Sequence, residues 1–105
     1  YFRGFVFNKL YRKNIIDNLR FNEKIYIAED LLFNCEYLLK CKKCSYVNEK
    51  LYYYCNNDYS TLNKKMNSKY LSILDAYKKI EDIYKNNFMT TFCILKSVFL
   101  KSKVI

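Results

Sequence analysis

The clearest periodic pattern in the chain is a series of apolar residues at helical spacing between Met66 and Phe88. At helical pitch these residues share one face, which predicts a long amphipathic helix capped by Asn67 or Ser68. The opposite face carries acids and lysines three and four positions apart, as is typical of a solvated helix surface. We therefore expect the apolar face to dock onto protein. Its members are Met66, Tyr70, Ile73, Leu74, Tyr77, Ile80, Tyr84 and Phe88.

A second helix is predicted from about Ala28 to Cys41. Two carboxylates, Glu29 and Asp30, stand in its first turn, where the positive end of the helix dipole favours negative charge. A leucine-rich stripe follows, and we expect it to face the core. Asp30 projects away from that stripe, so this helix can hold a carboxylate against something outside the core. The stripe consists of Leu31, Leu32, Cys35, Leu38 and Leu39, and the Asp30 side consists of Phe33, Asn34 and Tyr37.

The shorter segments complete the predicted fold class, which is mainly α with two short β-strands. Residues 44–47 and 51–55 are β-prone runs rich in tyrosine, separated by a turn-like stretch, and they favour a hairpin or one bent strand. In chain order, we also expect a strand over residues 1–7, a short helix around Ile15 and Ile16 capped by Asn14, and a last helix over residues 90–104.

Length and charge limit the class of protein. With 105 residues and 51% hydrophobic composition, the chain is one folded domain or a piece of one. It starts at Tyr1 inside an aromatic run, and we interpret it as a fragment of a longer protein. The net charge of +9 comes mostly from lysine, which argues against a specific nucleic-acid reader. An anionic partner remains compatible, either a phosphate-bearing substrate or an acidic membrane surface.

The cysteines predict neither a disulfide framework nor a metal site. There are five, an odd number, and the chain has no histidine. Cys41 and Cys44 form one CxxC pair, but a structural zinc site would need the remaining thiols to converge on it. We expect reduced, buried thiols in a cytosolic protein. No stretch has the ~18 apolar residues that a membrane span requires, because Lys96 interrupts the best candidate.

Three motifs in order resemble the C-terminal half of bacterial family 2 glycosyltransferases, which have the GT-A fold. The first is Phe-Asn-Lys-Leu-Tyr-Arg at residues 7–12, and the second is Glu-Asp-Leu-Leu-Phe at residues 29–33. The third, Tyr-Val-Asn-Glu-Lys-Leu-Tyr-Tyr-Tyr, covers residues 46–54 and precedes Ser60. The resemblance extends over residues 5–60, whereas residues 61–105 match only as a helical tail. It implies an acceptor-side part of the catalytic domain in residues 1–60 and a helical extension in residues 61–105.

The resemblance also implies roles for individual residues. Asp30 matches the general base that takes the proton from the acceptor hydroxyl, with Glu29 as a supporting residue. Lys9 and the ring faces of Tyr52 and Tyr54 are the expected substrate contacts. Each residue also has a purely structural alternative. Glu29 and Asp30 could simply be favourable first-turn acids, Lys9 a surface lysine, and at least one of the tyrosines a core residue. Two residues depart from the family pattern: Phe7 replaces the usual Trp, and Cys55 stands where a basic residue is common.

The family's donor site lies outside the matching motifs. Nucleotide-sugar binding and the Asp-x-Asp metal motif belong to the N-terminal half, and this sequence contains neither Asp-x-Asp nor a glycine-rich phosphate loop. We therefore expect no cofactor in this chain, a divalent metal (Mg or Mn) in the full-length enzyme, and no activity from these residues alone. The expected location is the cytoplasm, including peripheral contact with the inner face of the cell membrane.

Two other functions fit the same sequence. A basic, tyrosine-rich module could bind single-stranded nucleic acid by stacking, with lysines along the backbone. A helical interaction module without catalysis could instead be built on the Met66–Phe88 helix. The interaction-module hypothesis is compatible with the chain being a fragment of an enzyme. A fragment with uncovered apolar faces is expected to self-associate through its helices.

Overall fold

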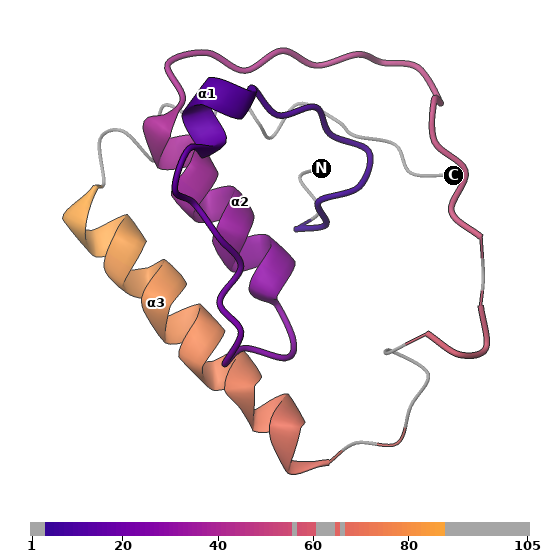
Figure 1. Ribbon diagram of the computed structural model, residues 1–105, viewed down its shortest axis with the longest axis vertical. Coiled ribbons are helices and arrows are strands. Elements are labelled where there is room, and N and C mark those ends of the chain that lie inside the picture. The colour runs from indigo at the N-terminus through magenta and orange to yellow at the C-terminus, as the bar shows by residue number, and fades with distance from the viewer. Residues whose placement is uncertain (1–3, 56, 61–64, 66, 88–105) are drawn as a thin grey trace.

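The regular elements are helices arranged around one central helix. The computed structural model describes residues 4–55, 57–60, 65 and 67–87. Its elements are α1 (Lys13–Ile16), α2 (Glu29–Lys40), the 3₁₀ helix η2 (Ser68–Leu71) and α3 (Ser72–Asn86). Figure 1 shows α2 and α3 side by side, with α1 against the C-terminal end of α2. The helical class predicted from the sequence is confirmed.

One face of α2 forms the hydrophobic core with α3. Leu32 of α2 packs with Ala76 and Ile80 of α3 and with Ile25, which precedes α2. These four side chains are at most 7% exposed, so their contacts remove nearly all of their surface from water. Five partly buried residues complete the cluster: Ala28, Leu31, Cys35, Ile83 and Tyr84.

A second face of α2 is also buried, which the sequence did not predict. Phe33 and Tyr37 are each 7% exposed and Asn34 is 2% exposed. They lie under the preceding part of the chain, where the Phe21 ring stacks on Phe33 at 4.4 Å and the Tyr11 ring meets Tyr37 edge-on at 5.0 Å. The partner that the Asp30 side of α2 faces is therefore the chain's own N-terminal segment.

The long helix forms at the predicted place but is rotated about its axis. The Asn67 side chain accepts a hydrogen bond from the Lys69 amide, which confirms the predicted cap. Ala76 and Ile80 are buried, whereas Leu74 and Tyr77, both members of the predicted face, are 65% and 53% exposed. Ala76, which is fully buried, packs in the core cluster with Leu32 of α2, where its small side chain leaves room for the facing helix.

The prediction of two strands is wrong. Residues 44–47 and 51–55 are described, and they follow an extended path without the backbone pairing of a sheet. In Figure 1 they belong to the wide arc that runs from the end of α2 around the N-terminal segment. A two-stranded hairpin is marginal in water without a third strand or a packed face, so β-propensity alone does not determine pairing.

Smaller differences concern the N-terminal part. Residues 4–7, the described part of the strand expected over residues 1–7, form a bend and a turn. The short helix α1 is confirmed, but its cap is Arg12 and not Asn14, and no side chain caps it. The helix expected over residues 90–104 and the ends of the apolar pattern at Met66 and Phe88 lie outside the described residues.

Candidate functional site around Asp30

The acidic pair begins α2 directly after a residue in a left-handed conformation. Ala28, the N-cap residue, has φ 67° and ψ 17° and offers no side-chain cap. A non-glycine residue in this region costs roughly 1–2 kcal/mol, and such strain often accompanies functional positions. The carboxylates of Glu29 and Asp30 follow in the first turn, where backbone N–H groups lack helical partners. The two acids thus follow directly after a strained backbone position.

Asp30 points at the N-terminal segment, which folds over α2. The Val6 amide donates a hydrogen bond to Asp30 Oδ2 at 3.3 Å. Asp30 also interacts electrostatically with the Lys9 ammonium and the Tyr11 hydroxyl. The turn that brings these groups together contains Asn8 with φ 62°, a conformation that asparagine tolerates better than most residues. The carboxylate therefore lies between a helix start and a tight turn.

Lys9 and Glu29, two residues predicted for the site, lie beside Asp30. Lys9 is half-buried and donates a hydrogen bond to the Phe5 carbonyl. Burial lowers the pKa of Lys9, and the charge of Asp30 opposes that change. Burial raises the pKa of Glu29; its own backbone amide opposes the shift, whereas the Asp30 charge adds to it. One cation and two carboxylates thus share a partly desolvated region.

Tyr11 and Asn34 are parts of this site that sequence reasoning did not assign. The Tyr11 hydroxyl donates to Asn34 Oδ1 at 2.6 Å, and the Asn34 amide donates to the carbonyls of Gly4 at 2.7 Å and Phe5 at 3.2 Å. Burial raises the pKa of Tyr11 well above its usual value, with further contributions from Asp30 and Tyr37, while the bond to Asn34 opposes the shift. Tyr11 is therefore a hydroxyl donor throughout the physiological range.

A signal for both residues existed in the sequence. Asn34 follows Asp30 by four positions, so the two share a helix face, and a polar residue on that otherwise aromatic face needs a partner. Tyr11 ends the Asn-Lys-Leu-Tyr motif that supplied Lys9. The sequence pattern does not reveal that the segment carrying this motif covers the Asp30 face of α2.

An aromatic wall, defined as Phe5, Phe7, Tyr52 and Tyr54, adjoins the carboxylate site. The Phe5 and Phe7 rings stack at 4.7 Å, and the Tyr52 ring stacks on Phe7 at 5.0 Å with planes 15° apart. Tyr54 lies tilted against Phe7 at 5.4 Å. Because Val6 contacts Asp30 and lies between the two phenylalanines, the wall and the carboxylate share one segment. Tyr52 and Tyr54 remain 37% and 46% exposed, so ring surface is accessible to a ligand.

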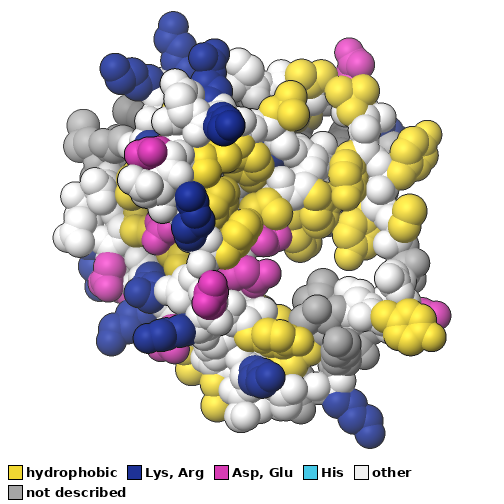
Figure 2. All heavy atoms as spheres, viewed as in Figure 1, with side chains coloured by type: hydrophobic (Ala, Val, Ile, Leu, Met, Phe, Trp, Pro, Cys, Tyr) yellow, Lys and Arg dark blue, Asp and Glu magenta, His cyan; other side chains and the backbone are white. Residues whose placement is uncertain are grey.

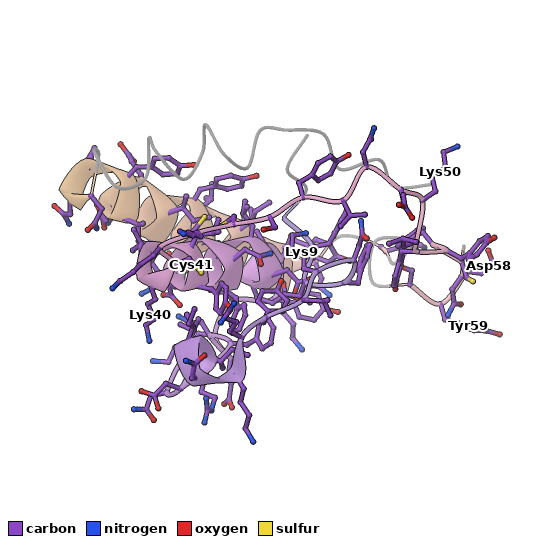
Figure 3. The ribbon with its side chains drawn as sticks, turned by 90° about the horizontal axis from the view of Figure 1, so that it is seen from above. Lys9, Lys40, Cys41, Lys50, Asp58 and Tyr59 are labelled. Carbon is purple, nitrogen blue, oxygen red and sulfur yellow. The ribbon has the colours of Figure 1, made fainter. Side chains whose placement is uncertain are left out.

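The outer end of the arc does not take part in this site. Figure 3 shows Lys9 beside α2, whereas Lys50, Asp58 and Tyr59 lie at the far edge of the arc, away from the helices. Tyr53 is 82% exposed and, among the described ring contacts, has no aromatic partner. The predicted residues Tyr52 and Tyr54 are thus brought to Phe7, while the tyrosine between them is not.

Comparison with known proteins gives no relative. No family model, no curated protein and no solved structure matches the chain. Within the described residues, no three His, Cys, Asp or Glu side chains are grouped to hold a metal ion. No helix in that part of the chain is long and apolar enough to cross a lipid bilayer.

Proposed function

We propose that this chain is the acceptor-side part of a GT-A glycosyltransferase of the hexosyltransferase type, with Asp30 as its general base. The observation that carries the proposal is the meeting of two distant motifs. The segment at residues 7–12 folds onto the helix at residues 29–33, and Lys9, Tyr11 and the Val6 amide come to surround Asp30. A merely helix-stabilising acid would need none of these neighbours.

The proposed reaction follows from the carboxylate and the wall. An acceptor sugar stacks one apolar ring face on Tyr52 or Tyr54 and directs a hydroxyl toward Asp30. Asp30 removes the hydroxyl proton while the oxygen attacks the anomeric carbon of a nucleotide sugar, and the nucleoside diphosphate leaves with the electron pair of the broken bond. Attack from the side opposite the leaving group inverts the anomeric centre. Lys9 and Tyr11 hold the carboxylate in position, and Glu29 supports it.

The donor and its divalent metal belong to residues outside this chain in the proposal. We expect the 105 residues alone neither to bind nucleotide sugar nor to transfer it. The product would be a polysaccharide or another cell-surface glycan, made from a glycan or lipid-linked acceptor.

The first prediction tests the base directly in a protein that joins this chain to its donor-binding half. Asp30→Asn should reduce kcat about 10²–10⁴-fold, because the amide cannot accept the proton, while nucleotide-sugar affinity stays near the wild-type value. Transfer is measured by nucleoside diphosphate release, and affinity by calorimetry. Asp75→Asn on the exposed face of α3 is the matched control. Near-wild-type turnover of Asp30→Asn would exclude Asp30 from the mechanism.

An interaction role is the second candidate, and a specific observation favours it. Leu71, Leu74 and Tyr77 follow each other at three-residue spacing along η2 and α3 and are 66%, 65% and 53% exposed. This set, called the α3 stripe below, is an apolar surface for a second copy of the chain.

A basic surface lies elsewhere on the molecule. Figure 2 shows Lys and Arg side chains gathered over the end of the molecule where α1 meets α2. That end is where we propose peripheral contact with anionic lipid.

A further inference from the structure

A loop at one end of the molecule, called the α1 loop below (residues 12–20), takes no part in the carboxylate site. Both of its ends are attached to the same side chain of α2. The Tyr11 ring meets the Phe33 ring edge-on at 5.9 Å, and the Phe21 ring stacks on Phe33 at 4.4 Å. The loop is therefore held at its base, while its outer side chains are turned to solvent.

Leu10, directly before this base, is fully exposed to solvent. The Tyr11 ring packs toward α2, and Arg12 continues with an extended backbone (φ −70°, ψ 123°). Successive side chains of an extended chain point to opposite sides, so Leu10 and Arg12 lie on the same outer side. A single exposed leucine is ordinary on a protein surface, and the charges around it decide which partner it fits.

The surroundings of Leu10 are strongly basic. Residues 12–20 and 40–43 together contain six cations and one acid. Because α1 packs against the end of α2, the two groups lie at one end of the molecule, where Figure 2 shows Lys and Arg side chains gathered and Figure 3 shows Lys40. All six cationic residues are exposed: Arg12, Lys13, Arg20, Lys40, Lys42 and Lys43.

A shallow, open hollow in the α1 loop offers a place for an anionic group. It is lined by Lys13, Asn14, Ile16, Asp17 and Arg20. Arg20 Nη1 donates to the carbonyls of Asp17 at 2.8 Å and Leu19 at 2.7 Å, which fixes the guanidinium and leaves its other N–H groups unused within the described residues. In the same part of the chain, no hydrogen bond or ion pair holds the side chains of Lys13 or Asn14.

The hollow also contains one acceptor. The Asp17 carboxylate can accept a hydrogen bond from a hydroxyl group, whereas it repels a bare phosphate. The lining therefore fits a headgroup that carries hydroxyls beside its phosphate, as phosphatidylglycerol does.

We propose that Leu10 and the α1 loop form a membrane contact, in which the hollow takes an anionic lipid headgroup and Leu10 inserts among the lipids. The inference rests on the peripheral lipid contact proposed above, but not on the transfer reaction. Exposed cations attract an anionic bilayer, and an apolar side chain among them adds burial in the interface. A nucleic acid would use the same cations but would gain nothing from the leucine.

Vesicle sedimentation with the full chain tests the contact. The probe is a vesicle of equal parts phosphatidylcholine and phosphatidylglycerol, and the reference is phosphatidylcholine alone. Wild type should bind the anionic vesicles at low ionic strength, and salt should release it. Leu10→Ser should lower the partition coefficient roughly three- to tenfold. The double variant Lys13→Gln, Arg20→Gln should lower it roughly ten- to thirtyfold.

Matched controls remove the same kinds of group elsewhere. Leu51→Ser truncates an equally solvent-exposed leucine on the arc, and the double variant Lys78→Gln, Lys79→Gln removes two exposed charges from α3. Both should change the partition coefficient less than about twofold, because these side chains lie away from the bilayer. Equal effects of Leu10→Ser and Leu51→Ser would overturn the proposal.

Tryptophan fluorescence reads insertion directly, since the chain has no tryptophan of its own. On the anionic vesicles, the emission of Leu10→Trp should shift to shorter wavelength and be quenched by brominated lipid, whereas Leu51→Trp should show neither effect. An unshifted Leu10→Trp, or binding to a single-stranded oligonucleotide without binding to the vesicles, would overturn the proposal. None of these outcomes affects the Asp30→Asn test, which measures sugar transfer.

Discussion

At the residue scale, one amide connects the N-terminal segment to the central helix. Asn34 is 2% exposed, and its side chain bonds the carbonyls of Gly4 and Phe5 and the hydroxyl of Tyr11. Every polar atom of that side chain is used, so the buried polar group carries little net cost. Its removal would take one hydrogen bond from each of these three partners, although the Phe5 carbonyl keeps its bond from Lys9 and the Tyr11 hydroxyl keeps its bond to the Val6 carbonyl.

Asn34→Ala should therefore lower the free energy of unfolding by about 2–4 kcal/mol. Urea unfolding followed by circular dichroism measures the change. Asn18→Ala is the matched control, because the exposed Asn18 side chain makes one long bond to Asp17 at 3.4 Å, and it should change stability by less than about 0.5 kcal/mol. Equal effects of the two substitutions would contradict the central role of Asn34.

Two other carboxyls give the protein a pH dependence with a defined sign. Burial raises the pKa of Glu29 above 4.5, and burial raises that of Glu36 while Lys79 and Lys40 oppose it. A group with a raised pKa in the folded state contributes stability below its unfolded pKa, and this contribution is lost as pH rises through the folded pKa. Wild type should thus lose stability relative to a protein without these charges as pH rises from about 4.5 to neutrality.

The double variant Glu29→Gln, Glu36→Gln measures the contribution of these two carboxyl groups to the pH dependence of stability. Its melting temperature relative to wild type should be higher at pH 7 than at pH 4.5, because only wild type has to charge two partly buried carboxyls. Glu23→Gln on the exposed loop is the control and should leave the difference unchanged. A constant difference across this range would show that neither carboxyl is linked to folding.

At the element scale, the two long helices were predictable from the sequence. The acids and leucines of residues 29–39 and the apolar period after Asn67 are local signals, and both helices form within a few residues of the expected bounds. The faces were less predictable. The sequence pattern predicts that Asn34 and Tyr37 point away from the core, whereas the N-terminal segment of the chain covers and buries them.

The strand prediction was wrong because it depended on long-range contacts, as did the surroundings of Asp30. Tyr and Val over residues 44–55 have high β-propensity, but pairing depends on a neighbouring strand that a local pattern does not reveal. The tyrosines find Phe7 instead. Asp30, Glu29 and Lys9 belong to short motifs that can be seen in the sequence, whereas the hydrogen bond between Tyr11 and Asn34 joins segments 23 residues apart.

Gly4 allows the N-terminal segment to lie close to α2. A Cβ atom built on Gly4 would lie 2.8 Å from Leu31 Cβ and 2.9 Å from Leu31 Cδ1, closer than Cβ atoms approach other carbons, and 3.2 Å from Leu31 Cα, which is a tight contact. Gly4→Ala should therefore destabilise the protein by roughly 1–3 kcal/mol, because the segment must move away from the helix. Urea unfolding measures the loss. Wild-type stability of this variant would mean that the close approach is not needed.

At the scale of the whole molecule, we expect self-association through the α3 stripe. Leu71 and Leu74 leave apolar surface in water, and pairing with a second copy would bury it. Wild type should show a concentration-dependent increase in mass by sedimentation, whereas Leu71→Lys, Leu74→Lys should remain monomeric. Lys79→Gln on the exposed polar face is the control and should behave as wild type. A wild-type monomer at high concentration would exclude this surface as an interface.

The aromatic wall has one more consequence, which concerns optical activity. The chain contains no tryptophan, so its near-ultraviolet circular dichroism arises mainly from tyrosine and phenylalanine. In the wall, the Phe7 ring lies between Phe5 and Tyr52 with interplanar angles of 13° and 15°. Rings held in one fixed, asymmetric stack give a stronger signal than freely rotating ones. The protein thus carries its own reporter of whether the arc is closed on the N-terminal segment, separate from the helical signal in the far ultraviolet.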